Sequence, residues 1–124
     1  MFIGVTGYNH ESSVALVDKY GDLIDFCKEE SLSRIKGDKS FPSRSIKKIL
    51  SSNNLKIKDI EKVAFYERPL SAFLHTVKQA SLNMPRSLDF LAHQFRNFNN
   101  SSTSCYLDFA KQFKGLEKKL IYSD

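Results

Sequence analysis

Three short apolar runs at the start of the chain constrain the fold more than any other feature of the sequence. They cover residues 2–6, 13–18 and 23–28, and only residues 19–22 separate the second run from the third. The glycine in that connection suits a tight turn. Parallel strands need a crossover of a dozen or more residues, and neither gap is long enough for one. The runs therefore predict three strands in an antiparallel meander.

The rest of the chain combines helical periodicity with two further strand patterns. Apolar residues at helical spacing predict four helices, over residues 42–52, 70–81, 88–98 and 105–115. Two more strands are predicted at Val63–Tyr66 and Lys119–Tyr122, and loops at residues 29–41 and 97–104. Because a helix separates the fourth strand from the meander, we expect this strand to run parallel to an earlier one through a right-handed crossover.

The order of elements predicts an α/β fold with one mixed sheet. It matches part of a ribonuclease-H-like (actin-like) lobe, in which a three-strand antiparallel meander is followed by parallel strands with helical crossovers. In such a lobe a helix follows the fifth strand and covers one sheet face, so residues 1–124 look like an incomplete lobe. We therefore expect Val5, Phe65 and Ile121, or their neighbours, to face water, and the isolated chain to form a homo-oligomer or to aggregate.

Length and composition bound the class of protein. A chain of 124 residues is one domain at most. Its longest uninterrupted apolar run, Val14–Val17, is far shorter than the ~18 residues that a bilayer-spanning helix needs. Cys27 and Cys105 are too few for a disulfide framework or a zinc cage, and both are expected to be reduced thiols. Without a secretory signal pattern, these observations favour a cytoplasmic protein with no membrane partner.

Positive charge is concentrated in the middle of the chain. The net charge is +5, and residues 34–62 hold nine Lys and Arg against three acidic residues, whereas residues 1–33 hold two against six. Such a segment can meet phosphates or nucleic acid, but a solvated helix face with Lys47 and Lys48, beside a charged loop, explains it more simply. Nucleic acid is a poor candidate partner, because the phenylalanines recur at the helical spacing typical of a core.

The turn after the first strand, Gly7–Ser13, contains the first candidate site residues. Its backbone N–H groups and its hydroxyl groups, such as that of Ser12, can hold an anion. His10 can act as an acid or base near neutral pH. A single histidine in a polar turn is more often a surface or packing residue, so this turn alone does not establish a catalytic site.

The loop over residues 29–41 is acidic at its start and basic at its end. Arg34, Lys36 and Lys39 can bind phosphate or carboxylate oxygens, arginine through its planar fork and lysine as a mobile point charge. The simpler alternative is a solvated loop closed by local ion pairs, each of which contributes little.

No metal site is predicted from the residues themselves. His75 and His93 have no second ligand at a suitable spacing, so both are expected to be structural. A metal-dependent nuclease of this fold would need a carboxylate inside the first strand, and residues 2–7 contain none.

Three segments resemble a known family. The turn reads Tyr8-Asn9-His10-Glu11-Ser12-Ser13, the loop ends in Arg34-Ile35-Lys36-Gly37-Asp38-Lys39-Ser40-Phe41-Pro42, and the fourth strand reads Val63-Ala64-Phe65-Tyr66-Glu67-Arg68-Pro69. Together they resemble the amino-terminal region of the O-carbamoyltransferases of nodulation-factor and antibiotic biosynthesis. Glu11 stands where that family usually has Asp. The resemblance is specific over residues 1–69 and weaker, though collinear, to Asp124.

The resemblance implies a large enzyme of which this chain is the amino-terminal part. Such enzymes have a two-lobe actin-like domain and a second domain that makes carbamoyladenylate from ATP and carbamoyl phosphate. The carbamoyl group then passes to a hydroxyl of a sugar or antibiotic, a small-molecule substrate. A bound iron uses a His-rich segment that follows a strand like Leu120–Asp124. The second lobe, the iron ligands and the ATP-using domain are therefore expected outside residues 1–124, and this chain alone should be inactive and hold no cofactor. The chain is then a truncated reading frame, a piece of a longer protein, or one part of a split enzyme whose partner is a complementing carboxyl-terminal chain.

The resemblance also implies roles for the candidate residues. It places His10 near the carbamoyl donor as the catalytic residue, and Ser12, Arg34, Lys36 and Lys39 near the donor or its phosphate. The alternative is a non-catalytic binding module with the same fold, which uses the basic segment 34–62 for an anionic partner.

Overall fold

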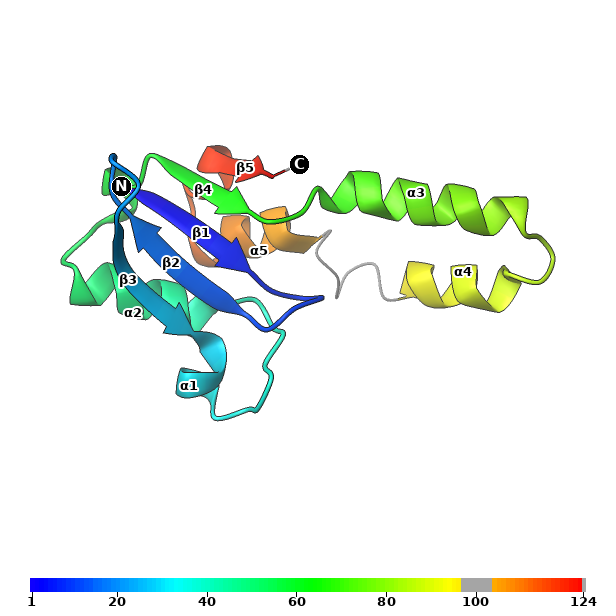
Figure 1. Cartoon of the computed structure of the whole chain (residues 1–124), viewed down its shortest axis with the longest axis horizontal. Helices are drawn as coiled ribbons and strands as arrows, with labels where there is room; N and C mark the ends of the chain where they lie inside the picture. The colour runs from blue at the N-terminus through cyan, green and yellow to red at the C-terminus, as the bar shows by residue number, and fades with distance from the viewer. Residues whose placement is uncertain (97–103, 124) are drawn as a thin grey trace.

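The computed structural model describes residues 1–96 and 104–123 and contains one five-stranded sheet (Figure 1). The order across the sheet is β3-β2-β1-β4-β5. The strands are β1 (Phe2–Thr6), β2 (Ser13–Val17), β3 (Leu23–Lys28), β4 (Lys62–Phe65) and β5 (Leu120–Tyr122). β1, β2 and β3 pair antiparallel, whereas β4 runs parallel to both β1 and β5. The predicted meander, the parallel fourth strand and the mixed α/β class are confirmed.

Two helices pack on the same face of the sheet. They are α2 (Ser43–Ser52) and α5 (Cys105–Gln112), which lie behind the sheet in Figure 1. Crossovers of the same hand that advance in one direction along a sheet place their helices on one face, which explains why the β3-to-β4 and β4-to-β5 connections share it. Alternate strand residues such as Val5 and Phe65 point into this core, with Ile46 of α2 and Phe109 of α5.

The opposite face of the sheet is open. One row crosses all five strands, because Gly4 pairs with Ala15 and Ala64, Ala15 pairs with Phe26, and Ala64 pairs with Ile121. Phe26 is 50% exposed and Ile121 is 46% exposed. A Cβ added at Gly4 would meet no atom within 4 Å.

An open face was predicted, but two of the three residues named for it were wrong. Val5 and Phe65 are buried, and only Ile121 faces water. Side chains alternate along a strand, so the two residues lie on the helix-covered face while their neighbours Gly4 and Ala64 lie on the open one.

The segment expected as a loop over residues 29–41 begins with a short helix, α1 (Glu29–Ser33). This helix ends at Arg34, whose φ of 63° lies in the left-handed region. The helix predicted over residues 105–115 is also shorter than expected, because α5 ends at Gln112 and Phe113 leaves the helical conformation. The 3₁₀ turns η1 (Ile57–Asp59) and η4 (Glu117–Lys119) precede β4 and β5.

A hairpin of two helices extends away from the sheet between β4 and α5 (Figure 1). It consists of α3 (Pro69–Leu82) and α4 (Leu88–Arg96), whose Phe73 and Phe95 rings lie 5.5 Å apart in an edge-to-face contact. Both helices were predicted, although the predicted end of the second and most of the predicted loop 97–104 lie outside the described residues. No described helix combines the length and apolar character needed to cross a bilayer.

Both edges of the sheet are irregular or short. The pairing of β3 with β2 shifts register between Leu16 and Val17. On the edge strand β3, the side chain of Asp25 accepts a hydrogen bond from the N–H of Phe26 at 2.7 Å. The other edge strand, β5, has three residues.

Candidate functional site: a basic cavity beside the histidine turn

The histidine turn, residues 7–12, leaves the carboxyl end of β1 beside the end of β4. Ligands of open α/β sheets bind outside the carboxyl ends of the parallel strands. Tyr66, directly after β4, donates a hydrogen bond from its hydroxyl to the carbonyl of Gly7 at 3.1 Å. The amide of Asn9 donates to the carboxylate of Glu67 at 3.1 Å. The ring of His10 lies 5.2 Å from that of Tyr66, edge to face.

Of the two predicted site residues in this turn, one faces solvent and one is buried. His10 is exposed. Ser12 is 1% exposed, and its hydroxyl donates to the carbonyl of Ser40. Its N–H donates to the carbonyl of Asp38 at 2.8 Å. Ser12 therefore joins the turn to the loop that follows α1.

The loop segment 38–40 is ordered by its own acidic residue. The buried Asp38 accepts hydrogen bonds from the hydroxyl of Ser40 at 2.6 Å and from the N–H of Ser40 at 2.9 Å. Burial acts to raise the pKa of Asp38, but hydrogen bonds from Ser33 and Ser40 and the charge of Arg44 outweigh it and lower this pKa below its usual value. The carboxylate therefore stays ionised and holds the loop beside the turn.

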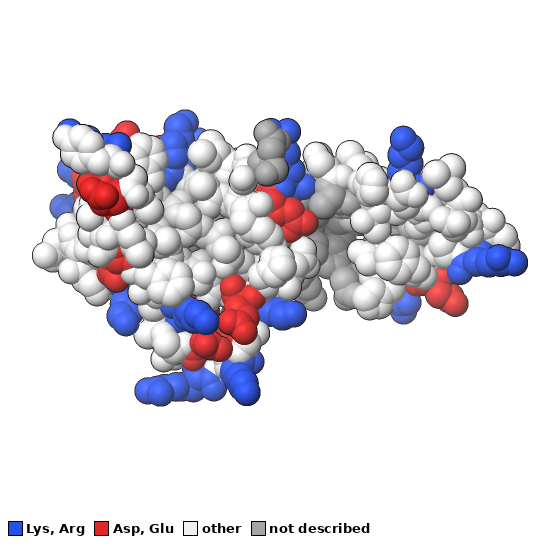
Figure 2. Space-filling model, viewed as in Figure 1, with Lys and Arg blue, Asp and Glu red and all other residues white. Residues whose placement is uncertain are grey.

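A cavity of about 550 Å³ lies next to the turn, where β3, α1, the following loop and α2 meet. Its lining contains four basic side chains, those of Lys28, Arg34, Lys36 and Lys48. The remaining lining residues are Phe26, Cys27, Glu30 and Ser31. Figure 2 shows basic side chains gathered around α1 and the loop after it, with acidic side chains beside them.

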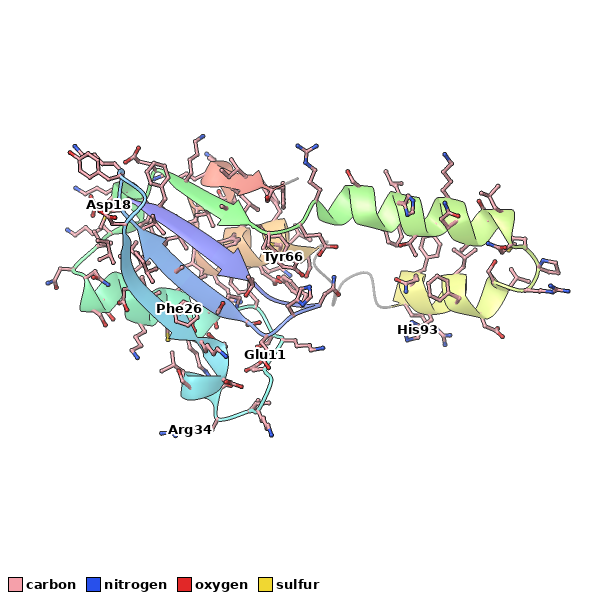
Figure 3. All side chains as sticks on the ribbon, in the orientation of Figure 1. Glu11, Asp18, Phe26, Arg34, Tyr66 and His93 are labelled. Atoms are coloured by element: carbon pink, nitrogen blue, oxygen red, sulfur yellow. The ribbon has the colours of Figure 1, made fainter. Side chains whose placement is uncertain are left out.

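The cavity contains two of the three basic loop residues that were predicted together. Arg34 and Lys36 line it, and Figure 3 shows Arg34 beyond α1, away from the sheet. Lys39 does not line it, but its carbonyl accepts the N–H of Tyr8 in the histidine turn at 2.7 Å. Lys48, assigned from sequence to a solvated helix face, lines the cavity, and so does Lys28 at the end of β3, which sequence analysis did not single out.

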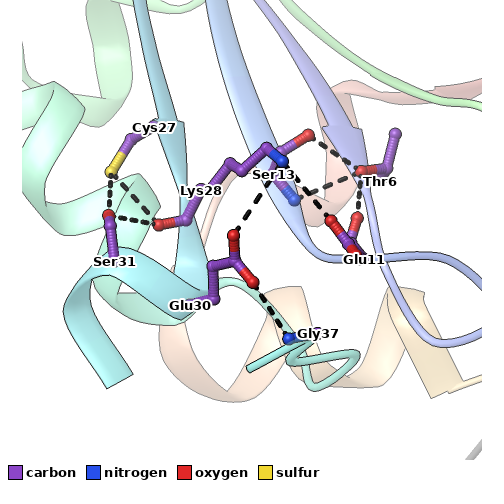
Figure 4. A network of polar contacts seen from close by, with 8 residues as sticks. All are labelled: Thr6, Glu11, Ser13, Cys27, Lys28, Glu30, Ser31 and Gly37. Carbon is purple, nitrogen blue, oxygen red and sulfur yellow. Dashed lines mark hydrogen bonds and ion pairs between the residues drawn. The ribbon is translucent and has the colours of Figure 1, made fainter. Parts of the chain in front are cut away.

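A polar network connects the turn with the cavity (Figure 4). The ammonium group of Lys28 lies 3.4 Å from the carboxylate of Glu11 and 3.9 Å from that of Glu30. Glu30 also accepts the N–H of Gly37 at 2.9 Å. Over the described ranges 1–96 and 104–123, the other three cavity cations have no carboxylate within ion-pair distance. Convergent cations without an acidic partner favour an anionic ligand.

The other two histidines lie on the hairpin, whereas of the two cysteines Cys27 lines the cavity. Figure 3 shows His93 on α4 of the hairpin, far from the histidine turn. His75 lies on α3 of the same hairpin. Within the part of the chain that the structure describes, no three His, Cys, Asp or Glu side chains are arranged to hold a metal ion. Cys27 and Cys105 are buried free thiols. Burial, followed by the charge of Asp108, raises the pKa of Cys105 to about 12, so this thiol is protonated at neutral pH.

The structure thus defines a mixed α/β domain whose cavity, beside the histidine turn, is lined by four basic side chains. The family model described as "Carbamoyltransferase N-terminus" matches residues 1–123, and the chain belongs to this family. The chain is also 34% identical over 86 residues to a protein of Synechocystis sp. named "Uncharacterized protein sll1178". The match covers 69% of this chain and 14% of that protein. The predicted resemblance to a carbamoyltransferase amino-terminal region is confirmed.

Proposed function

We propose that this chain is the part of a carbamoyltransferase that binds the carbamoyl donor. In the complete reaction a carbamoyl group passes from carbamoyl phosphate, through carbamoyladenylate made with ATP, to a hydroxyl of a sugar or antibiotic-like acceptor. The observation that carries the proposal is the convergence of Lys28, Arg34, Lys36 and Lys48 on one cavity beside the histidine turn. The phosphate of either donor species is the anion that such a cluster binds.

The basic residues differ in the contacts that they can offer. Arg34 has a planar guanidinium that can bond two phosphate oxygens at once. Lys36 and Lys48 are exposed point charges on flexible stems, approaching from the loop and from α2. Lys28 is restrained by two carboxylates, so its ammonium group is already ordered before a ligand arrives.

The residues of the turn act next to this anion site. His10 is the proposed acid–base group, which takes the proton of the acceptor hydroxyl as the carbamoyl group is transferred. Ser12 contributes by joining the turn to Ser40, and Lys39 by holding Tyr8 through its carbonyl. The side chain of Lys39 is exposed and supplies a further positive charge at this edge.

Other steps require groups outside these residues. The matched relative is several times longer than the matched segment, which covers 14% of it. We propose that a complementing carboxyl-terminal part supplies the iron and ATP sites. The use of ATP and carbamoyl phosphate is consistent with a cytoplasmic enzyme.

The proposal is tested by titrating carbamoyl phosphate into the isotopically labelled chain and following backbone amide signals by NMR. We expect the largest shifts at Lys28, Arg34 and Lys36. Arg34→Gln and Lys36→Gln should each weaken binding about tenfold or more, because one hydrogen bond to a charged group contributes about 1.5–3 kcal/mol. Lys47→Gln is the matched control, because Lys47 is exposed on the same helix as Lys48 but does not line the cavity.

Two outcomes would contradict the proposal. One is an equal loss of affinity in Lys47→Gln, which would indicate a diffuse field rather than a site. The other is absence of binding by carbamoyl phosphate together with salt-sensitive binding of a long polyanion, which would favour the non-catalytic module that uses segment 34–62.

The role of His10 needs an assembled enzyme. In a chain reconstituted with the rest of a carbamoyltransferase, His10→Ala should lower the rate by about 10²–10⁴, the usual contribution of a general acid or base. The melting temperature should hardly change, because the imidazole is exposed. Loss of stability and activity together would instead assign His10 to packing.

A further inference from the structure

Residues that precede and follow the helical hairpin in the sequence both contact the histidine turn. Tyr66 and Glu67 precede α3 and bond to Gly7 and Asn9 of the turn. Asp108 of α5, which follows the hairpin in the sequence, accepts a hydrogen bond from Tyr8 of the same turn. Segments separated by about forty residues of sequence therefore hold one short turn between them.

Tyr8 is the residue through which α5 contacts the turn. Its hydroxyl donates a hydrogen bond to the carboxylate of Asp108 at 2.5 Å. Its ring lies 6.1 Å from that of Phe65, edge to face. The hydroxyl of Ser104 donates to the same carboxylate oxygen at 3.1 Å. Asp108 is thus anchored at the start of α5 while it holds the tyrosine.

The backbone of Tyr8 depends on these contacts. Its φ of 65° lies in the left-handed region, which residues other than glycine seldom adopt. Such conformations cost about 1–3 kcal/mol and persist where the surroundings enforce them. Burial, followed by the bond to Asp108, raises the pKa of the Tyr8 hydroxyl far above its usual value, so the hydroxyl remains a donor over the physiological pH range.

The imidazole of His10 makes few contacts of its own. Among the interactions of the described residues, its imidazole has a ring contact with Tyr66 and no hydrogen bond. The orientation of the His10 imidazole therefore depends on the backbone conformation at Tyr8 and on the contact with the Tyr66 ring.

We propose that Tyr8 and Asp108 are positioning residues for His10, with Tyr66 supporting the imidazole from the other side. The bond between Tyr8 and Asp108 fixes the turn against α5, and the carbonyl of Gly7 is fixed against β4 by Tyr66. This inference rests on the proposed function, in which His10 acts beside the carbamoyl donor.

The experiment measures the position of His10 without requiring activity. The chain has three histidines, and His75 and His93 on the hairpin serve as internal controls. Tyr8→Phe removes only the hydroxyl group. Asp108→Ala removes the acceptor, whereas Asp108→Asn keeps a carbonyl oxygen that can accept the same bond. Tyr106→Phe is the matched control, since Tyr106 is an exposed tyrosine on the same helix.

We expect Tyr8→Phe and Asp108→Ala to shift the His10 ring signals and to abolish the nuclear Overhauser contacts between His10 and Tyr66. The other two histidines should keep their signals. Asp108→Asn should retain most of the contacts, and Tyr106→Phe all of them. In the same samples, affinity for carbamoyl phosphate should fall less in Tyr8→Phe than in Arg34→Gln, because Tyr8 does not line the cavity.

Unchanged contacts between His10 and Tyr66 in Tyr8→Phe would overturn the inference, whether or not carbamoyl phosphate binds. A variant that melts early and moves all three histidines equally would also overturn it, by assigning Tyr8 to stability alone. Failure of the wild-type chain to bind carbamoyl phosphate refutes the donor site instead, and leaves the ring contacts as the measure of positioning.

Discussion

Glu29 should be among the residues whose loss destabilises this domain most. It is 2% exposed and lies in the segment between the meander and α2. Its carboxylate accepts hydrogen bonds from the N–H of Arg44 at 3.1 Å, and from the N–H and the hydroxyl of Ser45 at 2.8 and 2.7 Å. The residue before α2 is Pro42, which has no side-chain cap to offer. Glu29 therefore caps α2 from a distant position in the sequence.

The magnitude follows from these contacts. Hydrogen bonds to a charged acceptor contribute about 1.5–3 kcal/mol each, and a carboxylate at a helix amino terminus adds about 0.3–1 kcal/mol. The cost of burying the charge and the entry of water after truncation offset part of this sum. We expect Glu29→Ala to lower the free energy of unfolding by about 2–4 kcal/mol. Glu29→Gln should cost about half as much, because it keeps one acceptor oxygen.

Urea denaturation followed by circular dichroism measures both variants. The midpoint should fall while the slope with denaturant stays constant. Asp22→Ala is the control, because Asp22 is an exposed acid in the turn before β3. If Glu29→Ala lies within about 0.5 kcal/mol of this control, the carboxylate does not cap α2 and the reasoning is refuted.

Three further predictions follow from packing and charge. Gly7→Ala should lower the free energy of unfolding in a urea melt by about 1–2 kcal/mol, because its Cβ would lie 3.0 Å from the buried Ser12 hydroxyl. Gly4→Ala replaces a strand glycine where the new Cβ meets no atom within 4 Å, so it should be neutral or stabilise by up to about 1 kcal/mol; equal losses in the two variants would contradict this. The open sheet face should make the chain self-associate or bind a hydrophobic dye at about 10 μM, and Ala15→Arg should reduce both in sedimentation and fluorescence; a dye-free wild-type monomer is the contrary result. Folding lowers the pKa of Asp38, so its stabilisation is present above the usual carboxylate pKa of about 4 and is lost as the pH falls below that value. Asp38→Asn should therefore reduce the fall in the free energy of unfolding at acidic pH, and an unchanged pH dependence would contradict this prediction.

The strand pattern could be predicted because it depends on short-range alternation. The runs at β1, β2 and β3 are apolar enough, and their connections short enough, to fix an antiparallel pairing. The sequence also located the histidine turn and the basic loop, since both carry motifs of the family. The face that each strand residue would occupy was harder to predict, and Val5 and Phe65 were assigned to the wrong one.

The features that were missed depend on contacts between distant segments. Helix α1 has little apolar content. It forms where the Glu29 carboxylate accepts hydrogen bonds from the start of α2 and the Glu30 carboxylate accepts one from the N–H of Gly37. Lys28 and Lys48 join Arg34 at one cavity only after β3 and α2 are packed together. The spacing of these residues in the sequence does not predict that they meet at one cavity. The link between Tyr8 and Asp108 spans 100 residues and was likewise not predictable.

The irregular edges of the sheet determine how this domain can associate. An exposed edge strand invites another strand to add to it, and repeated addition leads to fibrillar growth. The register shift beside β3 and the Asp25 side chain that occupies the Phe26 N–H discourage such addition at one edge. At the other, β5 offers three residues, too few to template a long partner. Association of this domain should therefore proceed through the open sheet face across Gly4, and because one partner covers that face, assembly stops at a discrete complex instead of continuing as a fibril.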